Sequence, residues 1–369
     1  MRSLIDPAAA LVCLLSMVVC GETALLADQS GAQAQQAGAS SSDAVHPEKS
    51  GETAAPDSAL AEATSLFASG KLDEAETSTR QFLAGHADSA DGHFLLAHIL
   101  FEELHEKYLG EEKAGGGGLG NNGNAGGELG KLRDAKARES LAEFSAGAKH
   151  GEPNAFDLKI VALDYVLLKD NLSADKWLSQ SLKLEPKDAQ SWFYLGRIKY
   201  SQDQFASAIE AYQQCLKLEP RNAEAEYNIG LSYEGLTQKD EAIQAYENAI
   251  AWQAQNGPKS PKPFAYLARV YLDENQPEKA VPYLLRAEEE FPQVSLIHEE
   301  LGRAYSALNE LTQAQEELEK AVWLAPDVAS IHFTLGQIYR RLGLIDKAKI
   351  EFQRAEELNG THSSDKPAN

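Results

Sequence analysis

The chain has 369 residues, 43% of them hydrophobic, and its formal net charge at pH 7 is -22. Because a surface that binds nucleic acid must be basic, this charge argues against nucleic acid as a partner. The length exceeds that of one compact core, but it does not require two domains, since a repeat protein can grow while each repeat contacts only its neighbours.

The first part of the chain has the pattern of an export signal. Residues 8–19 are almost entirely apolar and are followed by a stretch of small residues. That apolar length is typical of a signal-peptide core and is too short to span a bilayer. We therefore expect residues 1–27 to be a signal peptide, with cleavage after Gly21 or Ala27.

Cys20 offers an alternative, the attachment of a lipid anchor. We rank it second because Val19 stands where lipoprotein signals usually carry Gly, Ala or Ser. Either outcome exports the protein, so we expect it in the periplasm or outside the cell. Residues 28–55 have scarcely a large apolar side chain, and such a segment cannot bury enough surface to offset the entropy lost on ordering. We predict a disordered N-terminal leader there.

From residue 56 onward the chain repeats with a period of 34 residues. Pro186 and Pro220 are 34 residues apart, and so are Pro292 and Pro326. The unit that ends at Pro220 is marked by Trp192, Leu195, Gly196, Ala208 and Tyr212. This pattern resembles the tetratricopeptide repeat, which reads W-x2-L-G-x2-Y, then A-x3-F, then P.

A small residue recurs in the first helix of each aligned unit, twelve positions before the alanine of the second helix. These residues are Ala63, Ala162, Gly196, Gly230, Ala268, Gly302 and Gly336. Glycine inside a helix costs about 1 kcal/mol relative to alanine, so its recurrence indicates that two helices approach closely at this point. With one further, split unit, the resemblance implies an all-α fold, a right-handed α-solenoid of about eight units over residues 56–362. The units begin near residues 56, 90, 155, 189, 223, 261, 295 and 329.

Two insertions interrupt the predicted array. The first, about 110–133, contains the glycine-rich tract 114–130, which we predict to be a disordered loop. Loop-closure entropy grows only slowly with length, so the array should tolerate it. The second, residues 255–263, lengthens the turn before the next unit.

The last unit carries polar residues where other units carry apolar ones. Lys349 and Glu356 occupy such positions, and polar replacements on the outer face are typical of a terminal capping repeat. We expect Gly360 to end the last helix and residues 363–369 to form a tail.

The sequence offers little for catalysis. His98, Glu102 and His105 could share a helix face and ligate a metal. They would leave the coordination shell incomplete, so a polar helix face is the favoured interpretation over a metal-dependent activity. Cys215 lies where later repeats carry alanine, which indicates a packing thiol. The sequence contains no phosphate-binding glycine loop, HExxH or CxxC motif, and we predict neither an enzyme nor a cofactor.

The resemblance also implies a binding surface. In tetratricopeptide repeats the first helices line the concave side, and the second, fifth, ninth and twelfth residues of each unit point inward. Here those positions include Lys159, Phe193, Arg197, Tyr200, Tyr227, Arg269, Arg303, Phe333 and Arg340. Arginine binds carboxylates bidentately and aromatic rings supply contact area at low entropic cost, so we predict a groove for a peptide with acidic residues. An equally weighted alternative is that the arginines cover apolar surface and pair with Glu224, Glu234 and Glu299.

We rank two functions, a preferred one and an alternative. The first is an exported scaffold that binds protein or peptide partners. The second is a structural or assembly component of the cell envelope that associates with itself through its terminal units or its leader. Binding of chaperone tails is disfavoured, because Leu163 and Leu231 stand where that subgroup carries polar residues.

Overall fold

The structure is a computed structural model, and it describes residues 56–114, 128–255 and 259–363. Two predicted segments lie wholly outside these residues, the signal peptide 1–27 and the leader 28–55. Three others lie partly outside them: the glycine-rich tract 114–130, the insertion 255–263 and the tail 363–369. Within the described ranges all regular structure is helical, and none of these helices is long and apolar enough to span a membrane.

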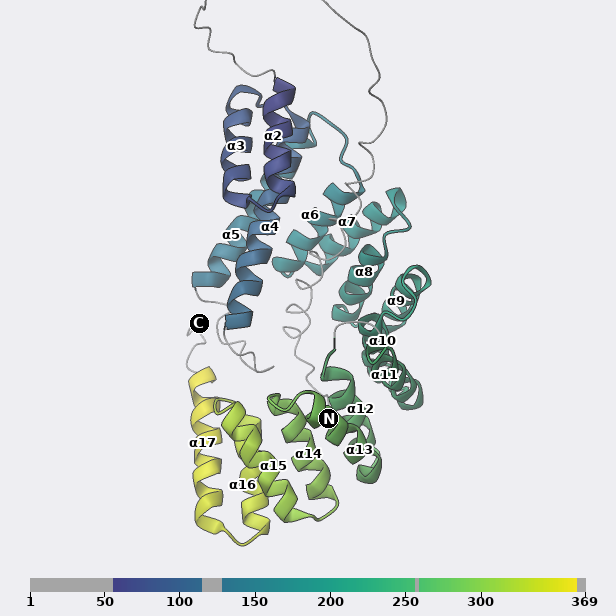
Figure 1. The fold of residues 1–369 in the computed structure, drawn as a ribbon, viewed down its shortest axis with the longest axis vertical. Helices are drawn as coiled ribbons and strands as arrows, with labels where there is room; N and C mark the ends of the chain where they lie inside the picture. Colours follow the sequence, from purple (N-terminus) through teal and green to yellow (C-terminus); the bar gives the residue numbers. More distant parts are fainter. Residues whose placement is uncertain (1–55, 115–127, 256–258, 364–369) are drawn as a thin grey trace, which may run out of the picture.

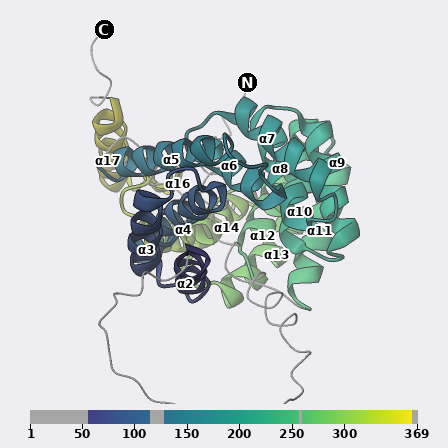
Figure 2. The same ribbon diagram turned by 90° about the horizontal axis from the view of Figure 1, so that it is seen from above.

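The described helices form eight consecutive pairs. Their bounds are α2 (Pro56–Ala68) with α3 (Leu72–Gly85), α4 (Ala90–Ala114) with α5 (Glu128–Gly147), α6 (Ala155–Leu167) with α7 (Asn171–Leu184), α8 (Ala189–Ser201) with α9 (Phe205–Leu218), α10 (Ala223–Gly235) with α11 (Lys239–Gln253), α12 (Lys262–Asp273) with α13 (Pro277–Glu290), α14 (Ser295–Ala307) with α15 (Leu311–Leu324), and α16 (Ala329–Arg341) with α17 (Ile345–Ser363). Figure 1 shows the pairs following one another along a curved path, and Figure 2 shows the same path from above. The predicted α-solenoid is confirmed.

The recurring glycines are the points of closest approach within the pairs, as predicted. A Cβ atom added to any of the four would lie 2.5 to 2.7 Å from a large side chain of the second helix. The contacts are Gly196 with Tyr212, Gly230 with Tyr246, Gly302 with Leu318 and Gly336 with Phe352. Glycine is therefore required for packing at these positions, and its low helix propensity is the accompanying cost.

The turns inside seven of the eight pairs, all those that the structure describes, share one backbone conformation. A single residue with positive φ follows the first helix at Gly70, Lys169, Asp203, Thr237, Asn275, Asn309 and Gly343. The next amide then bonds back to the helix, as Gln238 N–H does to the carbonyl of Tyr233 at 2.9 Å. This hydrogen bond is typical of the Schellman motif, which satisfies the last carbonyls of a helix.

Thr237 is the one β-branched residue among these turn positions, with φ of 61°. Left-handed backbone costs a residue with a Cβ roughly 1 to 2 kcal/mol, so we expect Thr237→Gly to raise the free energy of unfolding by about 1 kcal/mol. Urea denaturation measures it. The reverse change at the equivalent site, Gly343→Thr, should lower the free energy by a similar amount, and a loss of stability in Thr237→Gly would contradict the strain.

The helices extend further than the sequence pattern predicted. Helix α4 continues to Ala114 and α5 begins at Glu128, so both ends of the predicted loop 110–133 are helical. The reason is composition, since the segments EEKA and ELGKLR consist mainly of good helix formers. The glycine run itself begins only after Ala114.

The second insertion and the last helix need similar corrections. Helix α12 begins at Lys262, inside the predicted insertion 255–263, because a proline in the first turn lacks only an N–H that has no intrahelical partner. Helix α17 runs through Gly360 to Ser363, because glycine permits a left-handed helix stop but does not impose one.

Two smaller predictions agree with the structure. Lys349 and Glu356 are exposed on α17, as expected of a capping repeat. Cys215 is fully buried, and burial raises the pKa of its thiol to about 12. The thiol is therefore protonated at neutral pH and packs as an apolar group.

Three histidines join the two helices of their units through equivalent contacts. In each, Nε2 donates to a backbone carbonyl six residues earlier, at 3.0 to 3.1 Å, and Nδ1 lies 2.6 to 2.7 Å from a glutamate of the second helix. The pairs are His93 with Glu143, His298 with Glu317 and His332 with Glu351. In another unit Trp192 takes this position and donates to the carbonyl of Pro186 at 2.9 Å.

The contact at His298 should depend on pH. Burial alone would lower the pKa of His298, but it is outweighed by the hydrogen bonds to Glu317 and the Pro292 carbonyl and by the charges of Glu317 and Glu288, so the pKa is raised. The resulting stability is fully present below the pKa of an unfolded histidine, about 6.5. It is lost as the pH rises through the higher folded value.

We therefore expect His298→Ala to lower the free energy of unfolding more at about pH 5.5 than at about pH 8.5. Thermal or urea unfolding at both values measures the difference. Trp192→Ala, at the equivalent position, is the matched control and should cost the same at both pH values. An equal loss for His298→Ala at both would show that its charge contributes nothing.

Candidate peptide-binding surface

The first helices of the units form the inner side of the curve. Successive first helices contact one another, as α4 does with α6, α8 with α10, α12 with α14 and α14 with α16. Figure 1 shows α6, α8 and α12 on the inner side of α7, α9 and α13. We call the surface made by α6, α8, α10, α12, α14 and α16 the inner surface.

Four of the nine predicted groove residues are buried. Lys159 ties α6 to α8 by donating to Asp188 at 3.1 Å, and Asp188 is the N-cap of α8. Phe193 and Tyr227 pack against tyrosine rings of the second helices. Arg197 is only 6% exposed. Lys159, Phe193 and Tyr227 thus support the inner surface from below and are not available for direct contact with a partner.

The C-terminal end of the inner surface exposes an aromatic residue and a cation together. Phe333 is 51% exposed, and its ring lies 5.6 Å from that of Phe352. The exposed Arg340 places its guanidinium 5.7 Å from the same Phe352 ring. Tyr200, on α8, is half-buried, and the centre of its ring lies 5.4 Å from that of Phe205. These side chains could meet a partner directly.

Two of the predicted arginines share one buried carboxylate. Arg303 Nη1 donates to both carboxylate oxygens of Glu300, at 3.0 and 2.9 Å, and Arg269 Nε lies 3.8 Å from it. The Arg269 guanidinium also lies 4.9 Å from the Tyr266 ring. The side chain of Glu300 is only 3% exposed. Burial raises the pKa of Glu300 to about 7, although both arginines favour its ionised form.

Glu300 was missed by the sequence analysis because it is the sixth residue of its unit, and that position is not among those that point inward. A signal was present, since Glu300 precedes Arg303 by three residues, and side chains at that spacing are neighbours on a helix.

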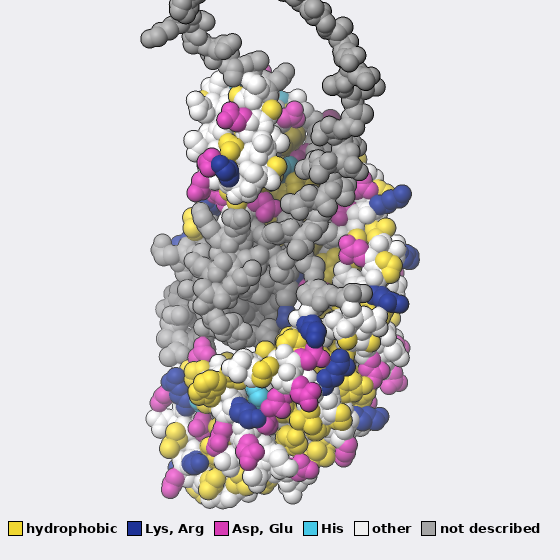
Figure 3. All heavy atoms as spheres, viewed as in Figure 1, with side chains coloured by type: hydrophobic (Ala, Val, Ile, Leu, Met, Phe, Trp, Pro, Cys, Tyr) yellow, Lys and Arg dark blue, Asp and Glu magenta, His cyan; other side chains and the backbone are white. Residues whose placement is uncertain are grey.

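The predicted pairing with the other three glutamates is not found. Among the residues that the structure describes, Glu224, Glu234 and Glu299 form no ion pair with an arginine. Burial raises the pKa of all three carboxyls, and Glu234 accepts a hydrogen bond from the hydroxyl of Tyr246. The inner surface is therefore mixed in charge. Figure 3 likewise shows acidic and basic side chains interspersed over α12 to α17.

The disfavoured alternative of a metal cluster at His98, Glu102 and His105 lies partly outside the described residues. His98 Nε2 lies 2.8 Å from Asp157 Oδ1 of α6, and its ring meets Phe156 edge to face. The side chain of His105 lies outside the described residues, so the group of His98, Glu102 and His105 stays a prediction.

A second group of possible metal ligands comes from Glu288, His298 and Glu317, whose ligand atoms lie within 4.8 Å of one another. Lys320 Nζ lies 3.0 Å from Glu288 and 2.8 Å from Glu317. The protein therefore supplies its own cation at this point, and we assign no metal to it.

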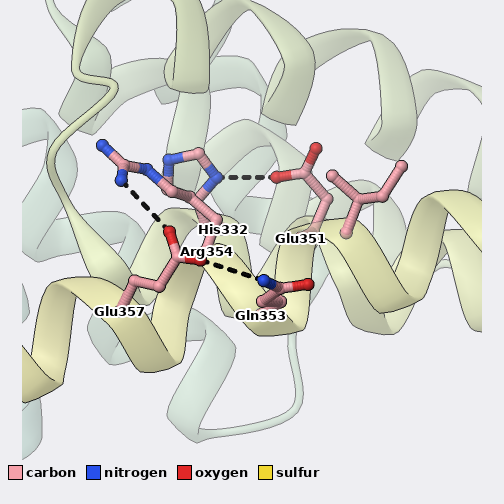
Figure 4. A pocket seen from close by; sticks show the side chains of 6 residues that line it. His332, Glu351, Gln353, Arg354 and Glu357 are labelled. Carbon is pink, nitrogen blue, oxygen red and sulfur yellow. Dashed lines mark hydrogen bonds and ion pairs between the residues drawn. The ribbon is translucent and has the colours of Figure 1, made fainter.

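The last unit has a shallow pocket whose charged lining residues form ion pairs with one another. Figure 4 shows its lining residues from α16 and α17, which are His332, Ile350, Glu351, Gln353, Arg354 and Glu357. His332 contacts Glu351 at 2.6 Å, and Arg354 contacts Glu357 at 3.5 Å. Its charged groups are thus paired with one another, and we infer no ligand site there.

Comparison with known proteins agrees with this architecture. Two family models described as "Tetratricopeptide repeat" match the chain, one at residues 60–103, 266–314 and 299–362 and the other at 223–256. A model described as "TPR repeat" matches residues 196–236. Together these ranges span more than half of the chain. No curated protein matches the sequence.

Several solved structures have a similar fold. The C-terminal part of a TPR repeat-containing protein from Cytophaga hutchinsonii is 19% identical with a TM-score of 0.51, over 63% of this chain and 93% of that one. YrrB, described as a TPR protein with an unusual peptide-binding site, is 22% identical with a TM-score of 0.40, over 50% and 94%. The MamA protein is 23% identical with a TM-score of 0.41, over 49% and 97%. At these identities the likeness concerns the fold alone.

Proposed function

Because this chain belongs to the tetratricopeptide repeat family, we propose that it is a scaffold that binds a protein or peptide on its inner surface and has no catalytic activity of its own. The observation that best supports this surface is the exposed Phe333 with the exposed Arg340, on the same face as the half-exposed Arg269 and Arg303. Aromatic residues and arginine are enriched among the residues that dominate binding energy at protein interfaces.

A random peptide library tests this proposal. Phage-displayed dodecapeptides are selected on the folded protein, and the affinity of the recovered peptides is measured by fluorescence polarisation. We expect Phe333→Asp to weaken binding by on the order of tenfold, which corresponds to about 1.4 kcal/mol. Leu172→Asp is the matched control, because Leu172 is 77% exposed but lies on α7, a second helix. Equal losses in both variants would contradict binding at the inner surface.

We further propose that residues 1–27 export the protein. The support is the apolar core of residues 8–19 with its small-residue flank. The mass of the protein purified from its native host is the test. We expect a mature chain that begins after Gly21 or Ala27, whereas a diacylglyceryl adduct on Cys20 would favour the lipid-anchor alternative. A cytoplasmic chain that keeps residue 1 would overturn both.

Self-association by end-to-end stacking receives less support at the C-terminal end. The positions of α17 that would stack on another unit carry the exposed Lys349 and Glu356. A polar outer face favours contact with water over contact with a second copy.

A further inference from the structure

Arg197 is a buried cation that forms no ion pair with a described residue, and its Nη1 atom has no hydrogen-bond partner among them. It lies on α8 at the inner surface, with its guanidinium 5.9 Å from the ring of Phe193. Its Nη1 atom is inaccessible to solvent, and no described residue accepts a hydrogen bond from it. A guanidinium that is taken out of water and left unpaired destabilises the fold, because nothing offsets the loss of hydration.

The other two arginines at the same place in their units differ in this respect. Both arginines contact Glu300, which lies in the unit after that of Arg269 and three residues before Arg303 on the same helix. The equivalent neighbours of Arg197 are Asn228 in the next unit and Tyr194 three residues earlier. Neither carries a negative charge at neutral pH, since asparagine does not ionise and burial raises the pKa of Tyr194. At these equivalent positions the repeat thus provides a carboxylate for Arg269 and Arg303 and none for Arg197.

The surroundings of Arg197 present further donors. The hydroxyls of Tyr200 and Tyr212 are buried, with no hydrogen-bond partner in the described part of the chain. Burial raises the pKa of Tyr212, and the nearby charge of Arg197 opposes that rise. Both hydroxyls can therefore donate. The nearby acid, Glu224 of α10, forms no ion pair with Arg197 in the described structure. Burial raises the pKa of Glu224, and the charge of Arg197 opposes that rise without outweighing it.

We propose that Arg197 binds a carboxylate of the peptide that lies on the inner surface, either an Asp or Glu side chain or a free C-terminus. The inference rests on the proposed function. Of the three arginines that could bind an acidic group of the peptide, it selects Arg197. A carboxylate accepts two parallel hydrogen bonds from a guanidinium, so a bound acid would supply the partner that Arg197 lacks. Arg269 and Arg303 already hold Glu300 and contribute less.

The library of random dodecapeptides, displayed without a free C-terminus, gives the first arm of the test. We expect peptides selected on the wild-type protein to share one acidic position. Selection on Arg197→Gln should lose that preference, whereas selection on Arg340→Gln, an exposed arginine of the same surface, should keep it. Peptides without an acidic position, or a preference that persists in Arg197→Gln, would overturn this inference alone. Recovery of no peptide by the wild-type protein would overturn the proposed function with it.

Synthetic copies of a selected peptide give the second arm. Replacing its acidic residue by the amide should weaken binding to the wild-type protein at least tenfold and leave binding to Arg197→Gln unchanged. Where the acid instead lies at the C-terminus, a peptide with a free terminus should bind tighter than its amidated form. Loss of affinity for both proteins alike would show that the acid is recognised elsewhere.

Stability without any peptide gives an independent readout. Arg197→Met keeps most of the side-chain volume and removes the unpaired charge, so its Tm should equal or exceed that of the wild type. Arg303→Met should lower the Tm, because it deprives the buried Glu300 of its closest partner. A lower Tm for Arg197→Met would show that Arg197 is already paired within the protein, and would overturn the inference.

Discussion

Replacing Gly230 by alanine is expected to lower the free energy of unfolding by roughly 1 to 2 kcal/mol, although alanine is the better helix former. The added Cβ would lie 2.5 Å from the ring of Tyr246, which is fully buried and has no free space to move into. Overpacking of a core typically costs about 1 to 3 kcal/mol. That exceeds the gain in helix propensity of about 1 kcal/mol.

The double variant Gly230→Ala with Tyr246→Leu tests the cause. Another unit of this chain carries alanine and leucine at the same two places, Ala268 and Leu284, and both are fully buried. The leucine should therefore accommodate the new Cβ and give a favourable coupling energy in a double-mutant cycle, measured by urea denaturation. Gly85→Ala is the control, because its Cβ would meet nothing within 4 Å. Additive losses in the cycle would show that the ring is not what requires glycine.

Replacing Glu300 by glutamine should remove a pH dependence of stability. Burial raises the pKa of this carboxyl from its ordinary value of 4.5 to about 7. Between these values the folded protein retains a proton that the unfolded chain has released, so its stability falls as the pH rises. One pKa unit corresponds to about 1.4 kcal/mol, which gives a fall of roughly 3 kcal/mol between about pH 4 and pH 8.

Glutamine cannot ionise, so Glu300→Gln should be less stable than the wild type or equal to it at the acidic end and should gain relative to it as the pH rises. Urea denaturation across the range measures both curves. Glu289→Gln, at an exposed neighbouring position, controls for the change in net charge. Curves for Glu300→Gln and the wild type that stay parallel from acid to alkaline pH would contradict the raised pKa.

The sequence was sufficient to predict the fold, because the residues that recur with the 34-residue period are the ones that pack the helices together. Gly230 could be interpreted before the structure was known, since glycine at one phase of a helix has few causes other than close approach. The helix ends near Ala114 and Glu128 could not be placed equally well, because glycine content outweighed the short runs of helix formers beside it. The helix propensity of the few residues at each end determines where a helix stops, and a repeat pattern compared over whole units does not register those residues.

The candidate site was harder to predict for a different reason. The family pattern indicates which residues face inward when each unit is considered separately, and Arg197, Arg269 and Arg303 look alike on that basis. What separates them is Glu300, which lies in the unit after Arg269 and three residues before Arg303, whereas Asn228 and Tyr194 occupy the equivalent positions for Arg197. Lys159 was likewise predicted to be accessible, but Asp188, the N-cap of the first helix of the next unit, accepts its hydrogen bond. Pairing across unit boundaries determines the electrostatics of the surface.

The contact of each unit with its immediate neighbours also gives the molecule a mechanical property. Because the described helices contact chiefly those of adjacent units, we expect a small rotation at each boundary to add to the next along the path of Figure 1. We therefore expect the array to deform like an elastic spring, in which the ends separate or approach while each interface changes little. A ligand that spans several units would therefore alter the pitch of this spring, and a pulling force applied at the two ends would alter the affinity in return.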